Sequence, residues 1–295
     1  MKLQLPKTLL RLIVLCYLIF FNLNSYCQNP NNEPLEKVKS KDWTEILDKD
    51  LTQWEVFTGV PDKSVVNIPA SYKKEPNGDH KQPLGLGDPM GIFKVISGEN
   101  GEPILHISGE VYAGLTSKKE YKDYHLTLLF KWGENKFEPR LERKRDNGVL
   151  YHCKGEHGAF WNVWKSSLEF QIQEGDFGDL YNLAGPSSKV TINKDLNWDP
   201  TSEIVNKTIH TKRSIDAESP RGEWTRIDLY VLGDKAIHVT NGKVVLALSE
   251  AKSKNGEILN SGQIQIQSEG AECFMKDINI RPIKKFPKKI LKDTY

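Results

Sequence analysis

Short segments in which apolar and polar residues alternate recur along most of this chain. The sequence SLEFQIQE at 167–174 is the clearest example, since every second residue is apolar. In a strand, successive side chains point to opposite faces, so one face of this segment would be buried. The other face would present Glu169, Gln171 and Gln173. A carboxylate flanked by two amides suits a ligand rich in hydroxyl groups.

Alternation of this kind predicts a chain built from strands, with no long helical periodicity. The predicted strands are Trp54 to Phe57, Ile92 to Ser97, Pro103 to Ser108, Ala113 to Ser117, Tyr124 to Trp132, Val149 to Cys153, Leu168 to Glu174, Trp224 to Leu232, Ala236 to Thr240, Lys243 to Leu248, Gln263 to Ser268 and Cys273 to Ile280. The stretches 61–90 and 193–223 show no regular pattern and are expected to be long loops.

Two Asn-Gly pairs, Asn100-Gly101 and Asn241-Gly242, each lie between alternating segments. Asn and Gly tolerate the positive φ angles of tight hairpin turns, so both pairs predict β-hairpins. Many short strands with turn residues between them indicate an all-β fold. We therefore expect a jelly-roll β-sandwich of the concanavalin A-like or glucanase type, with long loops.

The first 27 residues read as a secretory signal peptide. An apolar run ends at Phe21, and three basic residues, Lys2, Lys7 and Arg11, precede or interrupt it. Cleavage is expected directly after Cys27. This run is shorter than the roughly 20 residues that span a bilayer. A secreted and periplasmic location follows, with no membrane span after processing and no lipid anchor. Residues 28–40 are polar and expected to be flexible, and residues 41–295 would form a single domain.

Removing that segment takes three of the 41 Lys and Arg residues and leaves 38 basic against 39 acidic residues. A nearly neutral chain implies no nucleic-acid partner. Two cysteines remain in it, Cys153 and Cys273. An exported protein could pair them, but the sequence does not decide between a disulfide and two free thiols.

The order of several segments resembles the 3-keto-disaccharide hydrolase family, formerly a domain of unknown function. The resemblance rests on GVLYH at 148–152, SLEFQIQEGDFGDLY at 167–181, EWTRIDLYV at 223–231, HVTNGKVV at 238–245 and GQIQIQSEGAECFMKDINIRPI at 262–283. It implies a concanavalin A-like jelly roll that cleaves glycosides oxidised at sugar C3, by hydrolysis or by β-elimination followed by hydration.

That chemistry needs a base for the C2 proton, a positive or hydrogen-bonding group at the enolate oxygen, and an acid for the leaving oxygen. The candidates for proton transfer, all from the acidic and histidine-containing region, are Glu169, His152, Glu174 and Asp176. The candidates for substrate binding are Gln171, Arg145, Trp161, Trp164, Lys165 and Tyr151. A divalent cation is also compatible with the reaction, but no ligand spacing is diagnostic of a metal site.

Two alternatives remain from the sequence. Residues 169–174 also resemble the acidic strand of laminarinase-like retaining glycosidases, although Gln171 stands where those enzymes carry Asp. A retaining pair also needs its carboxyls about 5.5 Å apart, which a straight strand does not provide. The other alternative is a non-catalytic carbohydrate-binding protein, in which the same residues bind a sugar without turnover.

Overall fold

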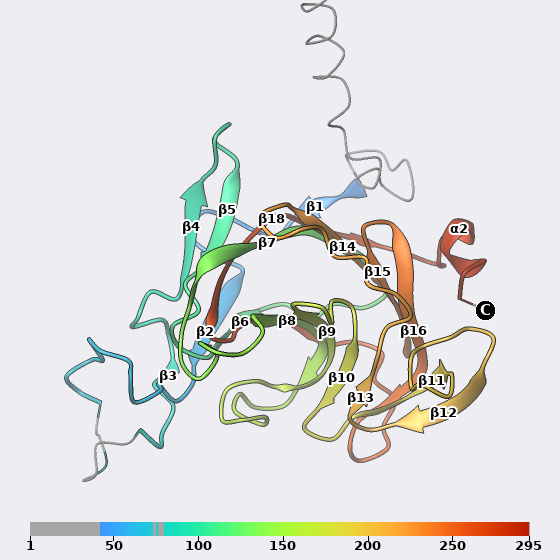
Figure 1. Cartoon of the computed structure of the whole chain (residues 1–295), viewed down its shortest axis with the longest axis horizontal. Helices are drawn as coiled ribbons and strands as arrows, with labels where there is room; N and C mark the ends of the chain where they lie inside the picture. The colour runs from blue at the N-terminus through green and yellow to red at the C-terminus, as the bar shows by residue number, and fades with distance from the viewer. Residues whose placement is uncertain (1–41, 73–74, 76–79, 295) are drawn as a thin grey trace, which may run out of the picture. The chain divides into compact units, whose positions relative to one another are not determined.

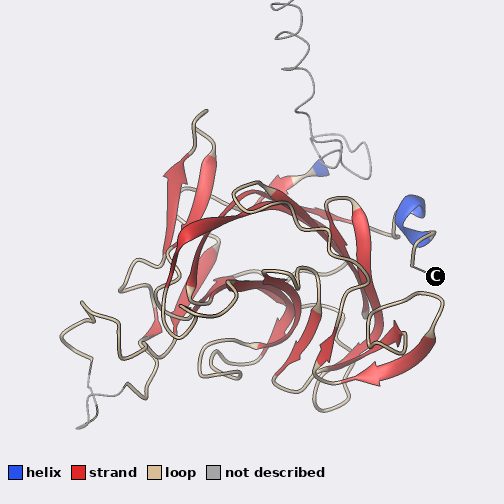
Figure 2. Ribbon diagram, in the orientation of Figure 1, coloured by secondary structure: helices blue, strands red, loops and turns tan. Residues whose placement is uncertain are grey.

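In the computed structural model, residues 42–72, 75 and 80–294 are described. The predicted signal peptide and the polar segment after it lie outside them. Strands dominate, and they form two antiparallel sheets that face each other (Figures 1 and 2). This is the jelly-roll β-sandwich that the alternating pattern predicts.

The larger sheet contains ten strands. Its order is β12 (Glu203–Lys207), β11 (Ser187–Ile192), β16 (Lys243–Lys252), β15 (Lys235–Thr240), β14 (Thr225–Leu232), β7 (Tyr124–Lys136), β18 (Ala271–Pro282), β5 (Pro103–Ile107) and β4 (Phe93–Ser97), with β1 (Thr44–Glu45) paired to β18. In Figure 1 this sheet curves over the smaller one. A short helix, α2 (Lys288–Leu291), follows β18.

The smaller sheet contains eight strands and carries the candidate site. Its order is β13 (His210–Thr211), β10 (Leu180–Leu183), β9 (Ser166–Gln173), β8 (Asp146–Lys154), β17 (Gln263–Ser268), β6 (Ala113–Ser117), β2 (Trp54–Thr58) and β3 (Gly85–Leu86). Strands β8 and β9 hold four of the predicted site residues, Tyr151, His152, Glu169 and Gln171, and both are central strands rather than edges.

The core lies between the two sheets. Leu168, Phe170 and Ile172 of β9 are fully buried there, as the alternation predicts. A one-residue shift of register would reverse the two faces of a strand, so the buried apolar row fixes Glu169 and Gln171 on the opposite face. That face is covered rather than open, since both side chains are also buried.

Every predicted strand is present, with ends shifted by a few residues. The region predicted to be a long loop at 193–223 contains β12 and β13, and β10 and β11 precede it. These strands are short, and β13 spans only two residues, paired with β10. Their alternation is too brief to detect in the sequence. They form because pairing with a neighbouring strand holds them in place.

The two Asn-Gly turns both connect neighbouring antiparallel strands, as predicted. Asn241-Gly242 is the tighter, since Thr240 pairs directly with Lys243 and both turn residues have positive φ. Both cysteines are free and buried. Burial raises the pKa of the Cys153 thiol to about 12 and that of Cys273 well above its usual value.

The Asn241 side chain links this turn to the preceding loop. Its Oδ1 accepts from the backbone N–H of Arg226 at 2.9 Å, and its Nδ2 donates to the carbonyl of Ala217 and the hydroxyl of Ser219. Three hydrogen bonds therefore depend on one buried amide.

We expect Asn241→Ala to lower the free energy of unfolding by about 2–4 kcal/mol, because it leaves buried partners unpaired and places alanine at positive φ. Asn100→Ala is the matched control, since Asn100 is exposed and should change the free energy by less than about 0.5 kcal/mol. Denaturant titration of both variants measures the difference. Equal effects would contradict this account of the turn.

Candidate active site

The outer face of the smaller sheet carries a row of acids and amides. Glu169 and Gln171 of β9 pair in register with Leu150 and Gly148 of β8. On the other side of β8, Gln267 of β17 belongs to the same face, because its neighbour Ile266 pairs with Val149. The amides of β17 thus extend the face that Glu169 occupies.

Within this face lies a groove pocket with a volume of about 130 Å³. Its residues come from the central strands β8, β9 and β17, from β10 and from three connecting segments: Arg140, Asp146, Phe160, Trp161, Trp164, Glu169, Gln171, Gln173, Tyr181, Leu183, Gln267 and Glu269. Six of them carry acids or amides, so the pocket suits a polar ligand.

Three carboxylates, Asp146, Glu169 and Glu269, line the groove pocket, and all are almost fully buried. The Arg140 guanidinium contacts both Asp146 and Glu269. Gln173 also donates to Asp146, with Nε2 2.6 Å from Oδ2. Two of the three acids are therefore paired with the same cation.

Burial of three carboxylates beside one cation changes the pKa of all three. Desolvation, followed by repulsion from Glu269 and Asp146, raises the pKa of Glu169 well above its usual 4.5. Desolvation and the charge of Asp146 raise the pKa of Glu269 well above 4.5 too. Desolvation also raises the pKa of Asp146 to about 6, although Arg140 opposes the rise. The groove pocket therefore favours the protonated form of these carboxyls more than an exposed site would.

Gly148 makes room for this cluster. A Cβ atom at this position would collide with a carboxylate oxygen of Glu169 and lie 2.6 Å from Oε1 of Gln267. The two side chains thus converge on the space above the Gly148 backbone. Oε1 of Gln267 is buried without a hydrogen-bond donor. A protonated Glu169 carboxyl can supply a donor in this space, which agrees with its raised pKa.

Aromatic rings form one wall of the groove pocket. Trp164 is buried, and its Nε1 donates to the carbonyl of Ala113 at 3.1 Å. Trp161 remains 59% exposed, with its ring stacked on Phe160 at 4.9 Å. An exposed ring beside a polar pocket can stack on the apolar face of a sugar. Trp164 fixes the loop, whereas Trp161 is free to contact a ligand.

Tyr181 of β10 lies opposite Glu169 in the sheet. Its ring stacks on His210 at 4.3 Å, and His210 in turn contacts the buried carboxylate of Asp179, with Nε2 2.7 Å from Oδ2. Burial, followed by the charge of Asp179, raises the pKa of Tyr181 to about 12. The phenol therefore keeps its proton at neutral pH and can act as a hydrogen-bond donor in the groove pocket.

Of the residues predicted from the sequence, the structure brings Glu169, Gln171, Trp161 and Trp164 together in the groove pocket. The others lie elsewhere. Tyr151 points between the sheets, where its hydroxyl lies 2.9 Å from Nε2 of His238. This side chain belongs to the core because β8 alternates in register with β9.

His152 also lies outside the groove pocket. It has a positive φ of 53° at an irregularity in β8, and it is buried. Burial lowers its pKa to about 4, so it is neutral at physiological pH. Lys165 is buried as well and precedes β9, with its backbone N–H bonded to Oε1 of Gln265 at 3.1 Å. Neither side chain lines the groove pocket.

The remaining predicted residues form ion pairs at the turn after β9. Arg145 contacts Glu174, with Nη1 2.9 Å from Oε1, and Asp176 contacts Lys144 at 2.7 Å. Hydrogen bonds from Arg145 lower the pKa of Glu174, despite its partial burial. An acid that is already paired and ionised is a poor proton donor, so these contacts favour a structural role for the turn.

Sequence analysis did not single out Arg140, Asp146 or Glu269. Arg140 and Asp146 lie in a highly charged stretch, ERKRD at 142–146 and the residues before it, which resembles a solvated loop. Glu269 follows the amide-rich strand β17, and that extension of the acidic face was the available indication. Within the described part of the chain, no three His, Cys, Asp or Glu side chains are placed to hold a metal ion.

Residues 42–281 match the family described as the 3-keto-alpha-glucoside-1,2-lyase-like domain. The chain belongs to this family, which places it among carbohydrate-active proteins. No curated protein matches the chain at the sequence level.

The chain is also similar to solved structures at low identity. A candidate glycosyl hydrolase from Parabacteroides distasonis is 17% identical, with a TM-score of 0.48, and the match covers 86% of this chain and 99% of that one. A second from the same organism is 15% identical, with a TM-score of 0.45 and coverage of 82% and 99%. The carbohydrate-binding module CBM66 from Bacillus subtilis is 8% identical, with a TM-score of 0.40 and coverage of 64% and 91%.

Between residues 42 and 294, leaving aside the short gaps, no helix is long and apolar enough to cross a membrane.

We expect Arg140→Met to lower the free energy of unfolding by about 3–5 kcal/mol, because it removes the cation from two buried carboxylates. The loss should grow as pH rises, since the pKa of Asp146, about 6 in the folded protein, marks where its charge develops. At low pH both acids are protonated and the loss should shrink. Thermal melts from pH 4.5 to 8 measure this dependence.

The matched control is Arg221→Met. Arg221 pairs with Glu134 at 2.6 Å, but both side chains are exposed. Such pairs contribute about 0–1 kcal/mol. A loss of the same size in both variants, or one independent of pH, would contradict the assigned role of Arg140.

Proposed function

We propose that this protein is a secreted enzyme that cleaves 3-keto-glycosides in the groove pocket. The observation that carries the proposal is the buried Glu169 carboxyl, whose pKa is raised, beside an arginine and two further acids. Family membership supplies the substrate class. The predicted signal peptide supports export to the periplasm.

The reaction begins with proton abstraction. The ketone at C3 acidifies the hydrogen on C2, and the ionised carboxylate of Glu169 removes it. The two electrons of the C–H bond form an enolate with its negative charge on the C3 oxygen. A carboxylate with a raised pKa is a stronger base than an ordinary one once it has lost its own proton. Glu169 suits this step because its burial disfavours the charged form.

The enolate then expels the aglycone from C1, and the leaving oxygen must receive a proton. Tyr181 lines the groove pocket and keeps its phenolic proton at neutral pH, so we assign it as the donor for this step. Arg140 is the positive group nearest to the acids and offsets the charge that develops on the enolate. Addition of water to the resulting enone completes a net hydrolysis, whereas release of the enone leaves the reaction a lyase.

The direct test uses a 3-keto-glucoside and its unoxidised parent, each incubated with the protein with and without a chelator. We expect product from the keto sugar only, because the unoxidised sugar has no acidic C2 hydrogen. No product from the keto sugar, together with binding of the parent glycan, would show a carbohydrate-binding protein instead. Cleavage of the parent would support the retaining-glycosidase alternative. Loss of turnover with the chelator would show a requirement for a cation.

We expect Glu169→Gln to reduce kcat by roughly 10²–10⁴-fold while preserving binding, because the amide keeps the shape but cannot accept the C2 proton. In the unaltered protein kcat should rise with pH, as the carboxyl with the raised pKa ionises. Glu257→Gln, at an exposed turn, serves as the control. A rate that falls with rising pH would instead identify Glu169 as the acid.

The same variant should be more stable than the unaltered protein at pH 8. The folded pKa of Glu169 lies above the unfolded value near 4.5, so folding costs increasingly more as pH rises through this interval. A neutral amide removes that cost. Thermal melts at pH 5 and pH 8 measure the change. A variant that is less stable at both values would mean that the ionised carboxylate has partners that stabilise it.

A further inference from the structure

The larger sheet ends at β12, and among the described residues no strand lies beyond this edge (Figure 1). β12 pairs with β11 on one side only. Glu203, Ile204 and Asn206 are exposed, and Val205 and Lys207 are half-buried. Backbone N–H and C=O groups on such an edge are free to pair with another strand. β12 contains no proline and pairs without a register shift, so nothing in the strand itself prevents that pairing.

The two charged residues of β12 lack partners within the protein. Glu203 begins the strand and Lys207 ends it. Among the residues that the structure describes, neither side chain forms an ion pair or a hydrogen bond. Both lie on the same face of the strand, with Val205 between them. Since Val205 packs against the edge of the core, this face carries an acid, an apolar residue and a base in that order.

This order of residues is complementary to itself. In an antiparallel pair centred on Val205, Glu203 of each copy lies opposite the partner's Lys207, and the two Val205 side chains lie opposite each other. Side chains placed in this way have Cβ atoms about 4.5–5.5 Å apart, and opposite charges there stabilise the pair. A two-fold axis through Val205 forms both ion pairs at once. A parallel pairing in register would place like charges side by side.

The other face of β12 adds apolar surface. Ile204 is 67% exposed, and it lines a pocket of about 200 Å³ together with Trp198 and Leu248. In the same antiparallel pair, the two Ile204 side chains are diagonal neighbours, which lie close enough for long side chains to touch. The pairing therefore removes an exposed isoleucine of each copy from water, which favours association.

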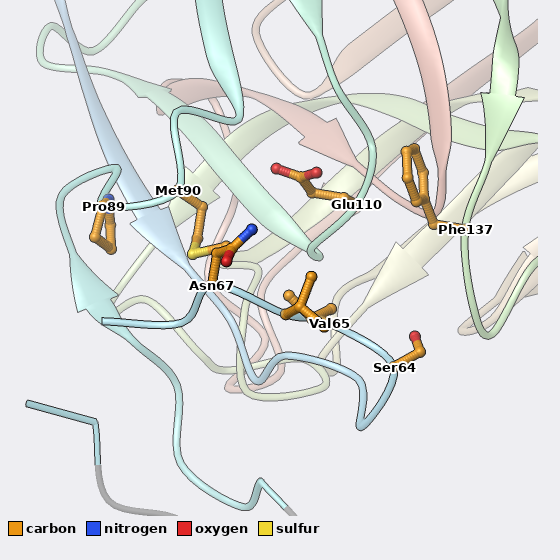
Figure 3. A pocket seen from close by; sticks show the side chains of 8 residues that line it. Ser64, Val65, Asn67, Pro89, Met90, Glu110 and Phe137 are labelled. Carbon is orange, nitrogen blue, oxygen red and sulfur yellow. The ribbon is translucent and has the colours of Figure 1, made fainter. Parts of the chain in front are cut away.

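The other sheet edges lack these properties. In the smaller sheet the edge strands β13 and β3 have only two residues each. At the opposite edge of the larger sheet, β4 has one charged residue, Lys94, and an antiparallel pair of two β4 strands would place it opposite Ile96. The loop at 61–90 also folds against the beginning of β4, where Met90 and Glu110 line a cavity of about 300 Å³ (Figure 3). β12 is therefore the edge that suits a second copy.

We infer that β12 is a self-association surface, through which two copies of this chain pair antiparallel with Val205 at the centre. The pairing joins the two larger sheets into one continuous sheet. β12 contributes no residue to the groove pocket, so the inference is independent of the proposed function. A pair of five-residue strands is small beside the roughly 1,200–2,000 Å² of a standard stable interface. We therefore expect a dimer that dissociates on dilution.

Analytical ultracentrifugation over a wide range of protein concentration tests the inference, and we expect a monomer–dimer equilibrium. Glu203→Lys and Lys207→Glu should each raise the dimer Kd roughly ten-fold or more, because each places like charges opposite each other at both ends of the pair. The double variant Glu203→Lys/Lys207→Glu restores opposite charges. Its Kd should return to within about three-fold of the unaltered value.

The matched controls are Glu99→Lys and Lys94→Glu. They change the net charge by the same amounts at exposed positions near the β4 edge, and they should leave the Kd unchanged. Thermal melts of every variant check that it is folded. Recovery in the double variant separates charge pairing from damage to the fold, because a second substitution would not repair such damage.

A protein that stays monomeric at every concentration would overturn the inference. A dimer that either single variant leaves unchanged would overturn it as well. Weakening by both single variants without recovery in the double variant would contradict the antiparallel pairing. Assemblies larger than a dimer would also overturn it, because a two-fold pair occupies the β12 edge of both copies and leaves neither for a third.

Discussion

The structure of the site depends on the burial of Asp146 and Glu269 against the guanidinium of Arg140. Buried carboxylates are costly unless they are paired and hydrogen-bonded. Arg140 offsets two of them, which leaves Glu169 on the same face without a cation of its own. Burial raises the pKa of Glu169, and the excess of acid over base adds to the rise. A second arginine would make the cluster more stable and its carboxyls less basic.

The fold tolerates these buried acids because the two faces of the smaller sheet differ. The inner face of β9 is fully apolar and packs against the larger sheet. Its outer face can then hold acids and amides at some cost in stability. Gly148 lies on that face and has no side chain, so Glu169 and Gln267 can occupy the space above its backbone. The inner face of β9 thus stabilises the fold, and its outer face carries the candidate site.

Much of the fold could be predicted from the sequence. Alternation identified the long strands, and the Asn-Gly pairs identified two hairpins, because these are local properties of the chain. Alternation did not identify β1, β3 or β10 to β13, which are short and held by their neighbours. The same limit applies to the site. Glu169 could be identified from the pattern of its own strand. Arg140, Asp146 and Glu269 could not, because only the folded structure brings their three segments together.

The misplaced candidates have physical reasons too. Tyr151 follows the period of β8 into the core, and His152 lies where that period is broken. Arg145 and Glu174 satisfy each other at a turn. Proximity in sequence to an acidic strand was a poor guide, because residues one position apart in a strand point to opposite faces.

The two free cysteines have a consequence for how the protein can be made. Each thiol is buried, and its raised pKa leaves almost no thiolate at neutral pH. Thiolate is the form that reacts with oxidants and disulfides. The two thiols of the described fold should therefore stay reduced in the folded protein, whether the surrounding solution is reducing or mildly oxidising.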